Sequence, residues 1–189
     1  MRNQEEYKNI ADGDKSKDGQ EGKPSILKDW IIPLLTALIL VLLINKFAFF
    51  IAKIPSESMV PTLNVGDRLI VTRIYNKDKL KRQDIIVFKS KEKDETMIKR
   101  LIGLPGDKVE IKAGVVSVNG TKLEENYIGQ PDTLGGSYTV PKGKYFFLGD
   151  NRLRSADSRY WDDPYIDWAD IEGKAQFKVF PFSDIGKLK

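Results

Sequence analysis

The sixteen uncharged residues Trp30–Asn45, WIIPLLTALILVLLIN, decide how this chain is organised. Lys46 follows them, and then the apolar residues Phe47–Ala52. A lysine at this place can extend its amine toward lipid head groups, so the apolar segment reaches the roughly 20 residues that a membrane-spanning helix needs. We therefore predict a transmembrane helix over residues 30–52, with the two ends of the chain on opposite sides of a membrane.

A cleaved signal peptide, a re-entrant segment and a buried core helix are the alternatives for this segment. Signal-peptide cleavage needs small residues at both recognition positions. Cutting after Ala52 places Phe50 in the outer position, and cutting after Ala48 places Lys46 there. We therefore favour an uncleaved, single-pass helix.

The tail before the helix, residues 1–29, holds six basic and seven acidic side chains and few large apolar ones. Such a composition cannot offset the entropy cost of folding, so we expect disorder. Basic residues concentrate on the cytoplasmic side of a membrane helix. Six precede this helix, whereas Lys46, Lys53 and Arg68 flank its other end. We therefore expect a cytoplasmic amino terminus and an extracytoplasmic domain over residues 53–189.

The residues after Lys53 are predicted to form a β domain. Short runs rich in Val, Ile, Phe and Tyr alternate with Gly, Pro, Asn and Asp. Asn119-Gly120 indicates a hairpin, because this pair accepts the positive φ angles of a type I′ turn. Residues 129–143 are expected to be a loop. The expected strands are 65–74, 84–88, 97–102, 108–112, 115–118, 144–148 and 174–180.

The chain contains no Cys and no His. Disulfides, thiolate nucleophiles, Cys-ligated or HExxH zinc sites and a Ser-His-Asp triad are therefore excluded. Any chemistry must therefore use hydroxyls, amines, carboxylates or bound ligands. The formal charge of +4 comes from interspersed basic and acidic residues, which does not suggest a nucleic-acid partner.

Two residues could form a nucleophile and its base. Pro55 and Pro61 keep Ser58 out of a regular strand, although an ordinary polar loop would have the same composition. Lys99 lies in a predicted strand in which alternation gives it apolar neighbours on its face, with Arg100 on the other face. A buried lysine can lose its charge as its pKa falls from about 10.4 toward 7 or 8, and it can then accept the proton of a serine. The alternative is a strand lysine with its amine in water.

A third segment, Gly149–Arg159, follows the apolar strand 145–148 and is rich in groups that pair with one another. Charge-assisted hydrogen bonds could make it rigid enough to orient Ser155, although a solvated loop is the alternative. The residues expected to pair are Asp150, Arg152, Asp157 and Arg159.

Together these segments resemble the bacterial type I signal peptidases, which are membrane-anchored Ser/Lys endopeptidases, and in particular their Gram-positive branch. Four segments match the boxes of that family in the same order: Pro55–Leu63, Gly66–Val71, Ile98–Asp107 and Gly149–Arg159. With the apolar helix, the resemblance covers about residues 30–159. Two positions depart from the family pattern, Arg154 and Asp162.

The resemblance implies a role for each matched residue. Ser58 would be the nucleophile, Lys99 the general base, Ser56 an oxyanion donor together with the Ser58 N–H, and Ser155 a hydrogen-bond partner of the Lys99 amine. Asp150, Arg152, Asp157 and Arg159 would support the site. The residues implied to line pockets for small substrate side chains are Ile54, Met59, Leu63, Leu69 and Ile98.

The resemblance also implies a mainly β signal-peptidase fold of coiled sheets, with a smaller lobe inserted at about residues 110–142. No cofactor and no metal are expected. The implied partners are signal peptides of exported pre-proteins, cut after an Ala-x-Ala-like site, together with membrane lipid and a nearby secretion translocon.

Two other classes remain as alternatives. A catalytically weak relative that presents substrates or assists pilus assembly would be expected to lack Ser58 or Lys99, and both are present. A self-cleaving repressor also uses Ser and Lys on a β scaffold, but the apolar helix and the lack of a DNA-binding helical region argue against it.

Overall fold

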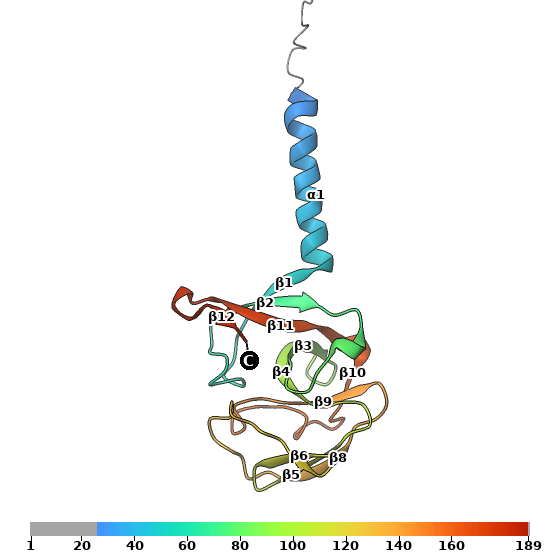
Figure 1. Ribbon diagram of the computed structural model, residues 1–189, viewed down its shortest axis with the longest axis vertical. Helices are drawn as coiled ribbons and strands as arrows, with labels where there is room; N and C mark the ends of the chain where they lie inside the picture. Colours follow the sequence, from blue (N-terminus) through green and yellow to red (C-terminus); the bar gives the residue numbers. More distant parts are fainter. Residues whose placement is uncertain (1–25, 189) are drawn as a thin grey trace, which may run out of the picture. The chain divides into compact units, whose positions relative to one another are not determined.

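The computed structural model describes residues 26–188 (Figure 1). The predicted disordered tail, residues 1–29, lies outside the described residues except for its last four positions. The chain divides into two compact units, with the boundary between Val41 and Leu42.

The apolar segment is helical. A π-helical turn, η1 (Leu27–Ile31), leads into α1 (Ile32–Phe47). Within the described part of the chain, Leu27–Ile44 is the one helical stretch long and apolar enough to cross a membrane, and none of it is buried. These residues therefore do not form a buried core helix. The hydroxyl of Thr36 donates to the carbonyl of Ile32 inside the helix, which satisfies the hydroxyl without water.

The helix is shorter than the predicted segment 30–52. It ends at Phe47, and Phe49–Lys53 form strand β1, which pairs antiparallel with β2 (Arg68–Arg73). Phe50 and Ala52 pack against buried core residues. Pairing with β2 and burial of alternate side chains therefore decide the structure here, and apolar composition alone cannot distinguish this strand from a longer helix.

Eight strands form one antiparallel sheet in the order β1-β2-β11-β3-β4-β9-β10, with β12 also paired to β11. Three short 3₁₀ helices connect them: η2 (Lys77–Lys79), η3 (Trp168–Asp170) and η4 (Phe182–Asp184). The remaining strands of this sheet are β3 (Ile85–Ser90), β4 (Glu95–Gly103), β9 (Lys144–Leu148), β10 (Ile166–Asp167), β11 (Ile171–Phe180) and β12 (Gly186–Lys187).

A second, four-stranded sheet has the order β7-β6-β5-β8. Its strands are β5 (Lys108–Lys112), β6 (Val115–Val118), β7 (Thr121–Lys122) and β8 (Gly136–Thr139). Asn119 and Gly120 have φ angles of 53° and 80° between β6 and β7, which confirms the predicted hairpin. The prediction of a loop over residues 129–143 is wrong for residues 136–139. These residues form β8, because they pair with β5, which is distant in the sequence.

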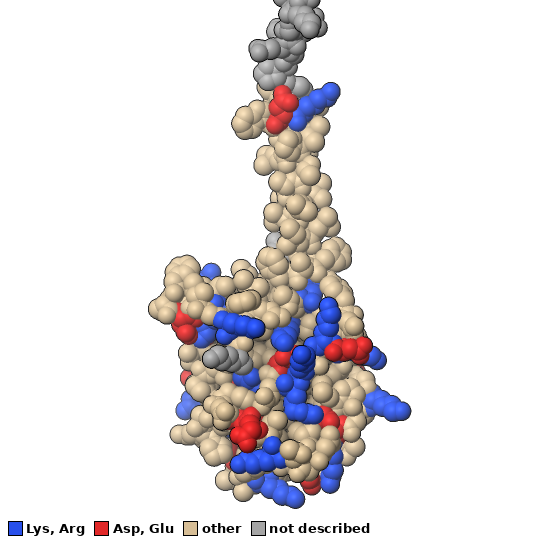
Figure 2. Space-filling model, viewed as in Figure 1, with Lys and Arg blue, Asp and Glu red and all other residues tan. Residues whose placement is uncertain are grey.

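The two sheets share a core. Ile102 and Phe146 of the large sheet pack in one buried cluster with Val109 and Val116 of the small sheet. The predicted mainly β structure is therefore confirmed, and β5, β6 and β9 have the predicted bounds. On the face of the β domain in Figure 2, Lys and Arg are interspersed with Asp and Glu, in keeping with the small net charge.

Candidate active site

The amine of Lys99 lies against the hydroxyl of Ser58. Lys99 Nζ donates to Ser58 Oγ at 2.9 Å and to the carbonyl oxygen of Ile98 at 3.2 Å. Ser58 Oγ also lies 3.4 Å from Ser56 Oγ. Lys99 and Ser58 are 3% and 6% exposed, so the contact is almost free of bulk water. Three of the predicted site residues are thus brought together by β4 and the loop after β1.

Burial lowers the pKa of Lys99 to about 8, from an ordinary value of 10.5. Desolvation of the ammonium is the largest cause. The carboxylates of Asp157, Glu95 and Asp150 act in the opposite direction, but they do not compensate for it. The neutral fraction of the amine therefore rises from about a tenth at pH 7 to about half at pH 8, the range in which a general base is effective.

The segment after β9 holds the backbone of Ser58 in place. The Asn151 N–H donates to the Ser58 carbonyl at 3.0 Å, and the Asn151 side chain donates to the Glu57 carbonyl at 3.1 Å. A Cβ atom at Gly149 would lie 2.5 Å from the Ser58 carbonyl oxygen and closer still to Ser155 Oγ. Glycine at position 149 therefore allows this segment to pack directly against the Ser58 loop.

The predicted hydrogen bond between Ser155 and the Lys99 amine is not formed. Ser155 is 4% exposed, and its Oγ has no hydrogen-bond partner within the described part of the chain. The Lys99 amine uses Ser58 and the Ile98 carbonyl as its acceptors instead. Ser155 is therefore next to the site, packed against Gly149, without contacting the amine.

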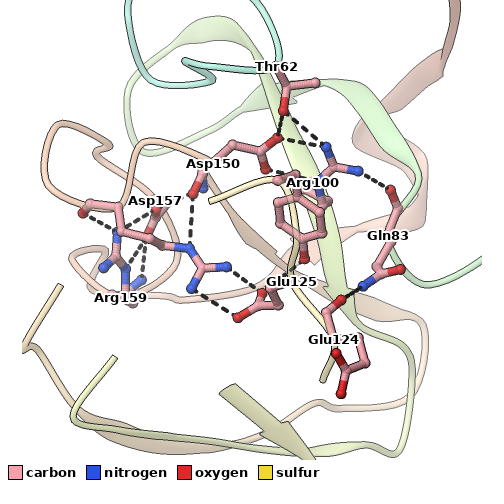
Figure 3. A network of polar contacts seen from close by, with 11 residues as sticks. Thr62, Gln83, Arg100, Glu124, Glu125, Asp150, Asp157 and Arg159 are labelled. Carbon is pink, nitrogen blue, oxygen red and sulfur yellow. Dashed lines mark hydrogen bonds and ion pairs between the residues drawn. The ribbon is translucent and has the colours of Figure 1, made fainter. Parts of the chain in front are cut away.

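The side chains of the predicted support residues are buried, but three of them have partners that the sequence did not indicate. Asp150 does not pair with Arg152. Its carboxylate accepts from Arg100 Nε at 2.8 Å and Nη2 at 2.6 Å, and from the Thr62 hydroxyl at 2.5 Å (Figure 3). The Arg100 guanidinium also lies 3.8 Å from the ring centre of Tyr127. The sequence did not identify Arg100 as the partner of Asp150. Strand alternation places Arg100 on the face of β4 opposite to Lys99, but it does not show that this face is also buried.

The other two predicted arginines extend this network, in which Figure 3 labels Arg159 and Glu125. Arg152 pairs with Glu125 at 2.5 Å and donates to the Gly149 carbonyl at 3.1 Å. Arg159 binds both carboxylate oxygens of Asp157 at 2.8 Å and also pairs with Asp132. Only the pairing of Asp157 with Arg159 was among the combinations that the sequence suggested. Glu125 and Asp132 come from the region of the small sheet, so the network joins that region to the active-site loop.

Ser58 and Lys99 line a groove of about 490 Å³. The other lining residues are residues 50–56, Val87 and residues 95–98 of β4. Ile54 and Ile98, two predicted pocket residues, contribute to its wall. Sequence reasoning missed Phe50, Ala52 and Met97, which also line it.

Three predicted pocket residues do not line the groove. Met59, Leu63 and Leu69 are each 0% exposed and belong to the hydrophobic core beneath it. An apolar residue near a site can serve the core or the pocket, and its sequence position does not distinguish the two.

Strand edges bound the groove. β4 pairs with β9 only through Arg100, Leu101 and Gly103, and β1 stands at the end of the sheet. The edges of β1 and of residues 95–99 therefore face the groove without a strand partner among the described residues. Such edges can pair with an extended peptide.

Comparisons with known proteins show the family to which this chain belongs. The model of the family "Signal peptidase, peptidase S26" matches residues 27–180. Signal peptidase I of Bacillus licheniformis is 37% identical over 184 residues, which are 91% of this chain and 98% of that protein. Signal peptidase I of Leptolyngbya laminosa is 43% identical over 162 residues, covering 80% of this chain and 79% of that protein. Signal peptidase IB of Staphylococcus aureus is 38% identical over 178 residues, which are 84% of this chain and 92% of that protein.

A solved structure titled as a signal peptidase I of Enterococcus faecalis V583 is 37% identical, with a TM-score of 0.46, and covers 51% of this chain and 96% of that chain. On the family model and the curated relatives, this chain belongs to the signal peptidase family, peptidase S26, whose members are serine endopeptidases. Relatives from Bacillus and Staphylococcus are thus among the curated proteins that match.

Proposed function

We propose that this chain removes amino-terminal signal peptides from exported pre-proteins, cutting after a small-x-small site with a Ser58/Lys99 dyad. The observation that carries the proposal is the 2.9 Å contact between the Lys99 amine and the Ser58 hydroxyl in the wall of a peptide-sized groove. The names of the curated relatives support signal peptides as the substrate.

In the first step the neutral Lys99 amine takes the Ser58 proton as Oγ attacks the carbonyl carbon of the scissile bond. The negative charge that develops on the carbonyl oxygen is stabilised by the Ser58 N–H and the Ser56 hydroxyl. Lys99 then gives the proton to the leaving amine, and an acyl-enzyme remains. In the second step Lys99 takes a proton from water as the water oxygen attacks the ester carbon. The bond between Ser58 Oγ and the acyl carbon then breaks, and Lys99 returns the proton to Ser58 Oγ.

The groove suits an extended segment ahead of the cut. A peptide between β1 and residues 95–99 of β4 would hydrogen-bond to one or both strand edges, which gives affinity independent of sequence. Alternate side chains would point toward Ile54 and Ile98 at its wall. We infer that these two residues favour small side chains at the first and third positions before the cut.

The helix Leu27–Ile44 would anchor the enzyme in the membrane. The basic residues ahead of it favour a cytoplasmic amino terminus, so the β domain would act outside the cytoplasm. Signal peptides are themselves apolar helices in the same lipid. We infer that the enzyme meets them in the membrane, near the translocon that delivers them.

The test uses the full chain in detergent with a pre-protein whose signal peptide ends in Ala-x-Ala. We expect one new amino terminus directly after the second Ala. Ser58→Ala and Lys99→Ala should each abolish cleavage, and the double variant should be no worse, because residues that act as a unit are not additive. Exposed Ser137→Ala and Lys112→Ala are the matched controls and should cleave normally. Full activity of Lys99→Ala would refute the dyad, and no cleavage by the wild type would favour the substrate-presenting alternative.

A further inference from the structure

An exposed ion pair lies beside the nucleophile, outside the groove. Arg154 Nη1 donates to the Glu57 carboxylate at 2.6 Å, and the two side chains are 70% and 53% exposed. Arg154 is one of the two positions that depart from the family pattern. Neither residue lines the groove, and neither takes part in the proposed Ser/Lys mechanism.

The pair is fixed relative to Ser58 by the backbone around it. Glu57 directly precedes Ser58 in the chain. Asn151 hydrogen-bonds to the carbonyls of both Glu57 and Ser58, and the Arg154 N–H donates to the Asn151 carbonyl at 3.1 Å. Arg154 therefore belongs to the same tight turn that positions the nucleophile.

The proposed function sets the direction of the substrate. Ser58 and Lys99 line the groove together with residues of β1, and the signal peptide, the part that becomes the acyl group, would lie in it. Residues after the scissile bond would then leave the groove at Ser58 and pass its outer side. Glu57 and Arg154 are the charged pair that the Ser58 loop and the turn after β9 present there.

The chemistry of the pair allows it to bind a substrate charge. The two side chains of an exposed ion pair are held together weakly, so each of them can move. A guanidinium has five N–H donors, and only one of them on Arg154 has a partner among the described residues. Arg154 can therefore receive a second carboxylate while Glu57 keeps it in place.

We propose that Arg154 selects substrates by the charge of the first residues after the cut, and that acidic residues there are preferred over basic ones. This inference rests on the proposed function. The substrates it favours are pre-proteins whose mature part begins with Asp or Glu.

The test compares three peptides that share one Ala-x-Ala sequence and differ only in the two residues after the cut: Asp-Asp, Ser-Ser and Lys-Lys. For the wild-type chain in detergent at low salt, we expect kcat/KM for Asp-Asp to exceed that for Lys-Lys by about three- to fivefold, the size of one exposed charge interaction. The ratio should fall to one or below in Arg154→Ala, because Glu57 keeps its charge, persist in Arg154→Lys, and invert in Arg154→Glu. It should also shrink at high salt, because salt screens exposed charges.

The ratio of kcat/KM between the peptides distinguishes substrate selection by Arg154 from a purely structural role of this residue. A purely structural role of Arg154 would lower kcat/KM for all three peptides equally and leave the ratio unchanged in every variant, which would overturn the inference. A wild type that cuts all three peptides equally would overturn it while leaving the proposed function intact. A wild type that cuts none of them would overturn both.

Discussion

Arg100 and Asp150 form a two-fold hydrogen-bonded ion pair in which both side chains are 1% exposed. Each stands next to a residue of the site: Arg100 follows Lys99 on β4, and Asp150 follows Gly149, which packs against Ser58. The pair therefore joins the strand that carries the proposed base to the segment that holds the proposed nucleophile. Charge-assisted, two-point contacts of this kind fix orientation as well as distance.

Breaking that pair should destabilise the protein strongly. Asp150→Asn or Arg100→Met leaves a buried charge without its partner, a change that typically costs about 3 to 5 kcal/mol. The measurement is urea unfolding of the full chain in detergent, followed by tryptophan fluorescence. Lys144→Met is the matched control, since it removes the more exposed ion pair with Asp163 and should change stability little. A loss no larger than that of the control would mean that the pair contributes nothing to the fold.

Ser56→Ala tests the proposed oxyanion donor. Loss of one such donor lowers kcat by about 10² to 10³ while substrate binding is largely kept, so the variant should be slow but measurable with a nearly unchanged KM. Steady-state cleavage of the Ala-x-Ala pre-protein gives both constants. An unchanged kcat would show that other groups stabilise the oxyanion.

The rate should rise with pH as Lys99 loses its proton. Because burial lowers the pKa of Lys99 to about 8, kcat/KM should be low at pH 6 and reach half its plateau near that value. Glu95 raises the pKa of Lys99, so Glu95→Gln should move this limb to lower pH. If kcat/KM rises at the same pH in Glu95→Gln as in the wild type, a group other than Lys99 controls this rise.

Removal of the buried amine should stabilise the fold. The pKa of Lys99 is about 8 in the folded protein and 10.5 in its ordinary state. The penalty for burying the charge is therefore complete below about pH 8, shrinks as the pH rises toward 10.5, and is absent above it. Lys99→Met should raise the free energy of unfolding at pH 7 by up to about 3 kcal/mol, less what the hydrogen bond to Ser58 contributed.

Urea unfolding of both proteins at several pH values checks this stability prediction. The gain should be largest near neutral pH and vanish at high pH. A difference that is flat with pH, or a less stable Lys99→Met at pH 7, would mean that the amine is solvated and cannot be the base.

Local patterns predicted much of the fold. Alternation and β-branched composition located β5, β6 and β9 to the residue, and the Asn119-Gly120 pair located a hairpin, because each depends on neighbours in the chain. The strand β1 was predicted as the end of the helix. An apolar run fits either structure, and only pairing with β2 distinguishes them.

The site was also predicted only in part, because local patterns do not show how distant segments pack. The four family-like segments selected Ser58 and Lys99, which lie 41 positions apart yet within hydrogen-bonding distance. They also suggested Met59, Leu63 and Leu69 as pocket residues, and these are buried core. Which apolar side chain faces a groove depends on what packs above it, and a local pattern does not contain that information.

The sequence by itself determined the chemistry that was available. Without His and Cys, a serine could be activated only by an amine or a carboxylate, and the uncharged segment required a helix of membrane-spanning length; both follow from composition, which folding does not change. Only the tertiary structure decided that Arg100, instead of Arg152, neutralises Asp150, that Ser155 does not contact Lys99, and that the Lys99 amine is desolvated. These depend on distances and burial between segments far apart in the chain, and they are fixed when the strands pack.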